Sequence, residues 1–75
     1  MACTIRLTKT LEIVIMDHSE FGYIIVHDKR GLRSIEKIQR EYPKTRFIVL
    51  FDPPINKINQ QLLRLVRSIC SEDQV

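Results

Sequence analysis

Two aspartates could form a chemical site, because each one comes directly after an apolar segment typical of a buried β-strand. Asp28 follows the segment 23–26 by two residues, and Asp52 follows the segment 45–51. If these segments are neighbouring parallel strands, both carboxylates lie at the carboxyl edge of the sheet, where open α/β proteins bind ligands. Such an edge could hold a metal or an anion. Each aspartate could instead cap the helix after it, and we favour that interpretation because capping explains both positions unaided.

The two histidines, His18 and His27, each adjoin an aspartate, which suggests a metal site built from His and Asp as a hypothesis. Such a site needs three or four converging ligands. Successive residues of a strand point to opposite faces, so His27 and Asp28 do not converge. No Ser or Cys has a suitable base and orienting acid nearby to make it a nucleophile. We therefore expect no metal, no cofactor and no catalytic residue, and we predict that the protein is not an enzyme.

Positive charge is concentrated in one part of the chain. Residues 29–46 contain seven of the twelve Lys and Arg residues and two of the nine Asp and Glu residues, which leaves +5 here and −2 elsewhere. On the helix predicted in this segment, several cations recur at helical spacing along a stripe that faces solvent. This stripe could contact the phosphates of a nucleic acid or an acidic protein surface. The predicted partner- or anion-binding residues are Arg30, Arg33, Lys37, Arg40 and Lys44.

The hydrophobic pattern predicts four strands and two helices in the order ββ-β-α-β-α. The expected strands are residues 4–8, 11–18, 23–26 and 45–51, and the expected helices are 29–42 and 53–70. Short turns favour antiparallel pairing of the first three strands, whereas a helix between strands three and four requires a parallel, right-handed crossover. We predict a single α/β domain over residues 1–75, with one small mixed sheet and two helices.

The second helix begins after Asp52, with a proline as its first residue, or after the rival cap Asn56. Its main apolar stripe is Ile55, Ile58, Leu62, Leu65 and Ile69. Leu63, Val66 and Cys70 form an adjoining stripe, which makes the apolar arc wider than packing on a small sheet requires. Both helices could share one face of the sheet and leave the other thinly covered. We therefore predict self-association through this adjoining stripe, giving a homodimer or a higher oligomer.

The two cysteines, Cys3 and Cys70, lie at opposite ends of the chain and lack CxxC spacing, which predicts two reduced thiols. The longest apolar runs are far shorter than the roughly 18–20 residues that cross a bilayer. The N-terminus does not resemble a signal peptide. We expect a cytoplasmic protein that has no contact with membranes.

Residues 23–51, and chiefly the run EYPKTRFIVLF at 41–51, resemble the central strand–helix–strand of response-regulator receiver domains, which are flavodoxin-like. By this resemblance Asp28 would occupy the phosphoacceptor position. Phe51 stands where the family has a hydroxyl switch residue, and no later lysine-bearing strand follows. The resemblance implies a pared-down signalling module without the residues needed for phosphorylation.

These observations predict a small, non-enzymatic regulatory or adaptor protein. It would act through protein–protein interaction, by self-association or by docking on a larger protein, and the basic helix would orient the partner. The alternative is a nucleic-acid-associated protein that uses the basic segment 29–46. The second alternative is a degenerate receiver-like signalling module.

Overall fold

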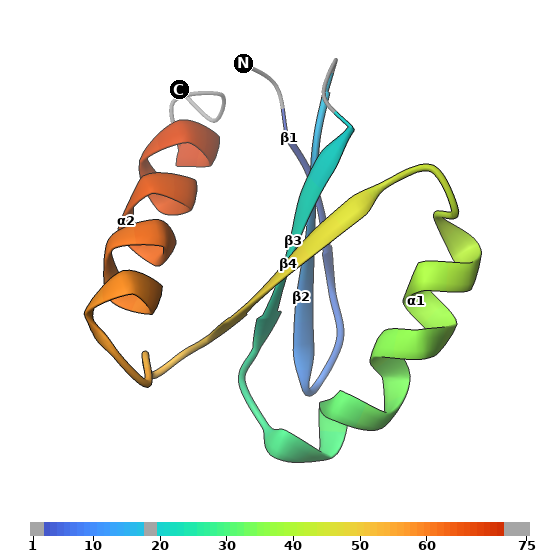
Figure 1. The fold of residues 1–75 in the computed structure, drawn as a ribbon, viewed down its shortest axis with the longest axis horizontal. Helices are drawn as coiled ribbons and strands as arrows, with labels where there is room; N and C mark the ends of the chain where they lie inside the picture. The colour runs from blue at the N-terminus through green and yellow to red at the C-terminus, as the bar shows by residue number, and fades with distance from the viewer. Residues whose placement is uncertain (1–2, 18–19, 72–75) are drawn as a thin grey trace.

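The computed structural model describes residues 3–17 and 20–71 and contains one four-stranded sheet with a helix on each face (Figure 1). The elements are β1 (Cys3–Leu7), β2 (Leu11–Met16), β3 (Phe21–Val26), the 3₁₀ helix η1 (Lys29–Ser34), α1 (Ile35–Glu41), β4 (Arg46–Phe51) and α2 (Lys57–Ser71). Every predicted strand and helix is present, with ends displaced by a few residues. The largest displacement is at the start of α2.

The sheet has the strand order β1-β2-β3-β4, so β1 and β4 are its edges. The pairings β1–β2 and β2–β3 are antiparallel, and β4 runs parallel to β3, with Val49 opposite Ile24. Short turns allow only antiparallel returns between the first three strands, whereas η1 and α1 together carry the chain back to start β4 in the same direction as β3. The predicted mixed sheet with a parallel connection from strand three to strand four is confirmed.

The two helices cover opposite faces of the sheet, as Figure 1 shows for α1 and α2. Leu11 and Ile13 of β2 belong to a core cluster with Ile38 of α1, whereas Val14 of β2 packs in a second cluster with Val66 of α2. The expectation that both helices share one face is therefore wrong. The helices cover opposite faces because β2 and β3 carry apolar side chains on both faces, and each face needs a helix to bury it.

Gly22 lies inside β3 and not in a turn, and neither of the two glycines has a positive φ. A β-carbon added to Gly22 would lie 2.8 Å from Cε1 of Phe47 and 2.9 Å from the carbonyl oxygen of Val14. The glycine therefore allows the ring of Phe47 to lie directly on β3. This close approach explains why the position holds a glycine.

The helix starts follow from caps and prolines. Asp28 caps η1, and the predicted first helix is a 3₁₀ segment followed by the shorter α1. Of the two predicted caps of α2, Asp52 is wrong and the rival Asn56 is confirmed: the carboxamide oxygen of Asn56 accepts a hydrogen bond from the N–H of Asn59 at 2.8 Å, as an N-cap does. A residue before proline avoids helical dihedrals, and Pro53 is such a residue. Neither α-helix of the described chain is long and apolar enough to cross a membrane.

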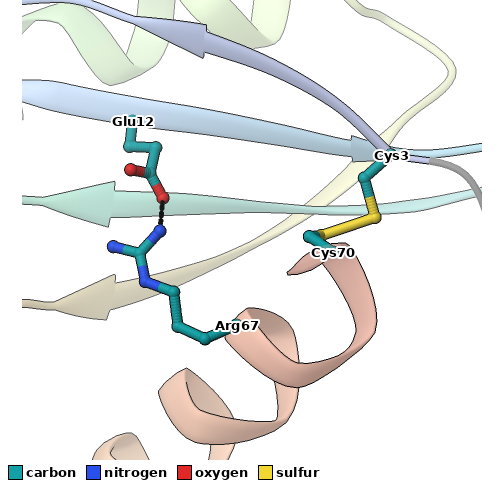
Figure 2. Close-up of a disulfide and its surroundings, with 4 residues drawn as sticks. All are labelled: Cys3, Glu12, Arg67 and Cys70. Carbon is teal, nitrogen blue, oxygen red and sulfur yellow. Dashed lines mark hydrogen bonds and ion pairs between the residues drawn. A yellow bond between two sulfur atoms is a disulfide. The ribbon is translucent and has the colours of Figure 1, made fainter. Parts of the chain in front are cut away.

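A disulfide joins Cys3 of β1 to Cys70 of α2, with their Cα atoms 5.6 Å apart (Figure 2). The prediction of two reduced thiols is therefore wrong. That prediction relied on the spacing of the cysteines in the sequence. The two residues are 67 positions apart, but they meet because the C-terminal end of α2 lies beside β1, the first strand of the chain. The bond ties the C-terminal end of α2 to the edge strand β1.

We expect reduction of the disulfide to destabilise the fold. A cross-link that closes a loop of 67 residues restricts the unfolded chain enough to contribute about 4 kcal/mol to the free energy of unfolding. Urea unfolding with and without a thiol reductant measures the difference. The variant with both Cys3→Ala and Cys70→Ala is the control, because its midpoint should not respond to reductant. Equal midpoints of the unmodified chain under both conditions would contradict the prediction.

Candidate functional site

A cluster of charged and titratable side chains lies between the sheet and α2. Arg67 donates a hydrogen bond from Nη1 to a carboxylate oxygen of Glu12, as Figure 2 shows, and its Nη2 lies 3.8 Å from Oδ2 of Asp52. His27 lies between the same two carboxylates, with Nδ1 3.7 Å from Asp52 and Nε2 3.9 Å from Glu12. Both histidine distances and the distance from Arg67 to Asp52 exceed those of hydrogen bonds, so the bond between Arg67 and Glu12 is the closest contact within this cluster.

Glu12 is the residue that makes this cluster necessary. It is the second residue of the inner strand β2 and is only 6% exposed. A buried carboxylate without a partner costs several kcal/mol, and Arg67 supplies the cation across 55 positions of sequence. The sequence pattern did not predict this pair. The available signal was a single acid within the otherwise apolar run LEIVIM.

Asp28 behaves as predicted from its position at the start of a helix. Its carboxylate accepts hydrogen bonds from the backbone N–H of Arg30 at 2.9 Å and from Nη2 of the same residue at 2.6 Å. The guanidinium of Arg30, followed by its backbone N–H, lowers the pKa of Asp28 from 3.8 to about 2. The prediction of a cap is thus confirmed for Asp28. It is wrong for Asp52, which meets His27 and Arg67 instead.

Both aspartates line one cavity of about 300 Å³ at the carboxyl edge of β3 and β4, the edge at which open α/β proteins bind ligands. The other lining residues are Val26, His27, Lys29, Phe51, Pro53, Pro54 and Ile55. Each carboxylate already has a cationic partner within the chain. Among the residues that the structure describes, no group of three or more His, Cys, Asp or Glu side chains is arranged to hold a metal ion. His18 lies outside the described residues.

The five cations of the predicted partner- or anion-binding set fall into two groups. Arg30 binds Asp28, and Arg40 donates to Glu36 at 2.9 Å in an exposed pair one helical turn apart. The remaining three form no hydrogen bond or ion pair with any other described residue, and all are exposed: Arg33, Lys37 and Lys44. Positive charge therefore remains on the surface of η1, α1 and the following turn, but less of it than the sequence suggests.

Exposed apolar side chains gather where β4 meets the N-terminal half of α2. Ile48 and Val49 of β4 are 36% and 37% exposed, and Ile58 of α2 is 69% exposed. These three line a groove of about 200 Å³ together with Ile55, which is also exposed. Leu65 lies two turns along α2 from Ile58 and is half exposed. We call these five residues the β4–α2 surface.

The side chain of Asn59 blocks strand pairing at the C-terminal end of the exposed edge of β4. Its carboxamide oxygen accepts a hydrogen bond from the N–H of Phe51 at 2.8 Å, and its amide nitrogen donates to the carbonyl of the same residue at 2.9 Å. The buried side chain thus occupies both backbone groups that a further strand would use. This contact was not predicted from the sequence, where the available signal was a polar residue within an apolar helical stripe.

The predicted self-association set does not form an exposed stripe. Val66 and Cys70 are 1% and 5% exposed and belong to the core cluster under α2, and Leu63 packs against that cluster. Residues buried in this way offer no contact area to a second chain, so this part of the prediction is corrected. The stripe expected to face the core instead contributes Ile58 and Leu65 to the surface. The helix is rotated relative to the prediction because Asn59, Arg67 and Cys70 all reach the sheet.

Comparisons of the chain with protein-family models, with curated proteins and with solved structures found no match. The resemblance of residues 23–51 to receiver domains therefore stays a prediction. Function has to be argued from the arrangement of the described residues.

Removing the partner of the buried acid should destabilise the fold. We expect Arg67→Met to lower the free energy of unfolding by about 3 kcal/mol, because Glu12 is left buried without a counter-charge. Adding Glu12→Leu to this variant should bring stability back to within about 1 kcal/mol of the original chain, since no unpaired charge then remains. Urea unfolding of the three proteins gives these differences.

Arg40→Met is the matched control for Arg67→Met, because it breaks an ion pair in which both side chains are exposed. It should cost at most about 0.5 kcal/mol. Equal losses for the two single variants would show that the Glu12–Arg67 pair has no special structural role.

Asp28 should titrate well below an ordinary aspartate. Because its folded-state pKa is lowered to about 2 from 3.8, its bonds to Arg30 stabilise the fold fully above pH 3.8 and are lost as the pH falls through about 2. The carboxyl ¹³C chemical shift of Asp28, followed by NMR, reports the midpoint. Arg30→Ala should move that midpoint toward 3.8, whereas Arg33→Ala should leave it unchanged. A midpoint near 3.8 in the unmodified chain would refute the assignment.

Proposed function

We propose that the protein is a small, non-enzymatic regulatory or adaptor protein that acts by binding other polypeptide chains. The observation that carries this proposal is the β4–α2 surface, where exposed aliphatic side chains line a groove beside an unpaired sheet edge. Contiguous apolar surface of this kind is typical of protein interaction sites. An exposed strand edge adds backbone groups that pair with an incoming strand.

The charged residues support a role in orientation and not in catalysis. The carboxylates of Glu12, Asp28 and Asp52 each have an arginine partner within the chain. Arg33, Lys37 and Lys44 project from the other helical layer and could steer an acidic partner, an effect that falls with salt concentration. We assign the apolar surface to affinity and these cations to orientation.

Both alternatives rank below this proposal. A nucleic-acid-associated protein would use the basic segment 29–46, but Arg30 and Arg40 already bind carboxylates of the chain, which reduces the charge available to phosphates. A receiver-like module would use Asp28, whose carboxylate is occupied by Arg30. The predicted cytoplasmic location is not carried into the proposal, because disulfides persist mainly in oxidising compartments.

A photo-crosslinking amino acid at Ile58 tests the proposal in the cells that produce the protein. Ile58 is the most exposed side chain of the β4–α2 surface, so a bound polypeptide should lie within reach of it. We expect discrete protein adducts on illumination, identified by mass spectrometry. These adducts include copies of the chain itself as well as other proteins.

The same amino acid at Leu7 provides the control. Leu7 is 70% exposed and lies on β1, the opposite edge strand, so it is equally accessible but distant from the β4–α2 surface. It should give no adduct of comparable yield. Failure of Ile58 to form any polypeptide adduct, or equal adducts from both positions, would remove the proposal.

A further inference from the structure

We infer that the polypeptide bound at the β4 edge is a second copy of this chain, paired antiparallel through β4 with Ile48 on the two-fold axis. This inference rests on the proposed function and names its partner. The product would be a continuous eight-stranded sheet formed from two four-stranded ones.

The backbone of β4 has a short stretch open to pairing. The N–H groups of Arg46 and of the following Asp52 bond to carbonyls of Glu20 and Val26, at 2.7 and 3.0 Å, and so point toward β3. Backbone groups alternate in direction along a strand, so those of the odd-numbered residues point away from the sheet. Asn59 already occupies the outward groups of Phe51. The open outward groups of β4 are therefore those of Phe47 and Val49, and Figure 1 shows this strand crossing in front of the other three.

This open stretch is centred on Ile48, which selects one symmetric register. When Phe47 of one copy pairs with Val49 of the second, the reciprocal pair forms by symmetry, and Ile48 lies opposite Ile48. Both pairs exchange two backbone hydrogen bonds, as close antiparallel pairs do. Neither pair disturbs Asn59. The interface is isologous, as two-fold dimers require.

The charges at the two ends of β4 favour an antiparallel copy. Lys44 and Arg46 lie at its start, and Asp52 follows its end. Antiparallel pairing in this register places Lys44 of one copy opposite Asp52 of the second. A parallel arrangement would place cations beside cations and acids beside acids, which is unfavourable. The charges of β4 and its flanking residues are thus complementary to those of an antiparallel copy.

The side chains on the α2 face of the sheet complete the contact. Ile48 and Leu50 belong to this face, and Ile48 lines the groove bounded by Ile55 and Ile58. Ile48 of the second copy would lie at the mouth of this groove, since opposite residues of paired strands share a face. Val49 of each copy would pack against Phe47 on the other face. Pairing would thus bury the two exposed aliphatic residues of β4.

Charge-swap variants at Ile48 test the register directly. Sedimentation of the full chain at several concentrations should show a mass rising from 8.9 kDa toward twice that value. Ile48→Lys and Ile48→Glu should each weaken dimerisation at least about tenfold, because like charges would face each other across the two-fold axis. An equimolar mixture should recover the dimer mass, since unlike charges then meet. Leu7→Lys, on the other sheet edge, should dimerise like the original chain.

Several results would overturn the inference. A constant mass of one chain excludes the dimer, and the proposed function still stands if Ile58 crosslinks to other proteins. A dimer unaffected by either Ile48 variant uses another surface. A mixture that stays monomeric while the original chain dimerises excludes the register. If circular dichroism shows that the Ile48 variants are unfolded, Val49→Pro replaces them: it removes an outward N–H without touching the β3 ladder, and a dimer that persists with it refutes the pairing.

Discussion

The burial of Glu12 in the central strand is the constraint on which the arrangement of α2 depends. A carboxylate that is 6% exposed needs a cation, and the cation comes from Arg67 on the last element of the chain. Because Arg67 must face the sheet, Val66 and Cys70 beside it are turned into the core. The disulfide to Cys3 holds the same end of the helix in the same orientation. One buried charge and one covalent bond thus determine which side of α2 is covered.

The side left uncovered follows from this rotation. Asn59 faces the sheet and forms hydrogen bonds with the backbone N–H and carbonyl of Phe51, while Ile58 beside it projects into solvent. The chain therefore combines a protected end and an open middle on the same edge strand. Natural sheets commonly protect such edges with charges or covering segments. Here the protection stops at Phe51, and an apolar groove lies beside the open part, which is why we assign function to this region.

The cations of the predicted binding set and the apolar groove occupy different parts of the molecule. Arg33, Lys37 and Lys44 belong to η1, α1 and the following turn, whereas the groove lies on the α2 face. The carboxyl edge of the sheet, where ligands often bind in α/β proteins, brings Asp28 and Asp52 to one cavity, but arginines from the same chain engage both. The sequence correctly indicated that these two residues share an edge. It did not reveal the partner of Asp52, because Arg67 is distant from Asp52 in sequence and its position depends on the orientation of α2.

What the sequence determined by itself is local: the order of the elements, the parallel return of β4 after a helical connection, and the cap at Asp28. The order of the elements follows from residue periodicity, and the parallel return follows from the length of the connection. The cap follows from a side chain that bonds to a backbone group two residues away. Only the tertiary structure decided which face each helix covers, how α2 is rotated, and that Cys3 meets Cys70. The physical reason is that these features depend on contacts between different elements of the chain, and those of Arg67 and Cys70 join residues more than 50 positions apart. An amphipathic pattern marks more than one apolar stripe on α2, and the buried partner across the sheet selects the stripe that packs inward.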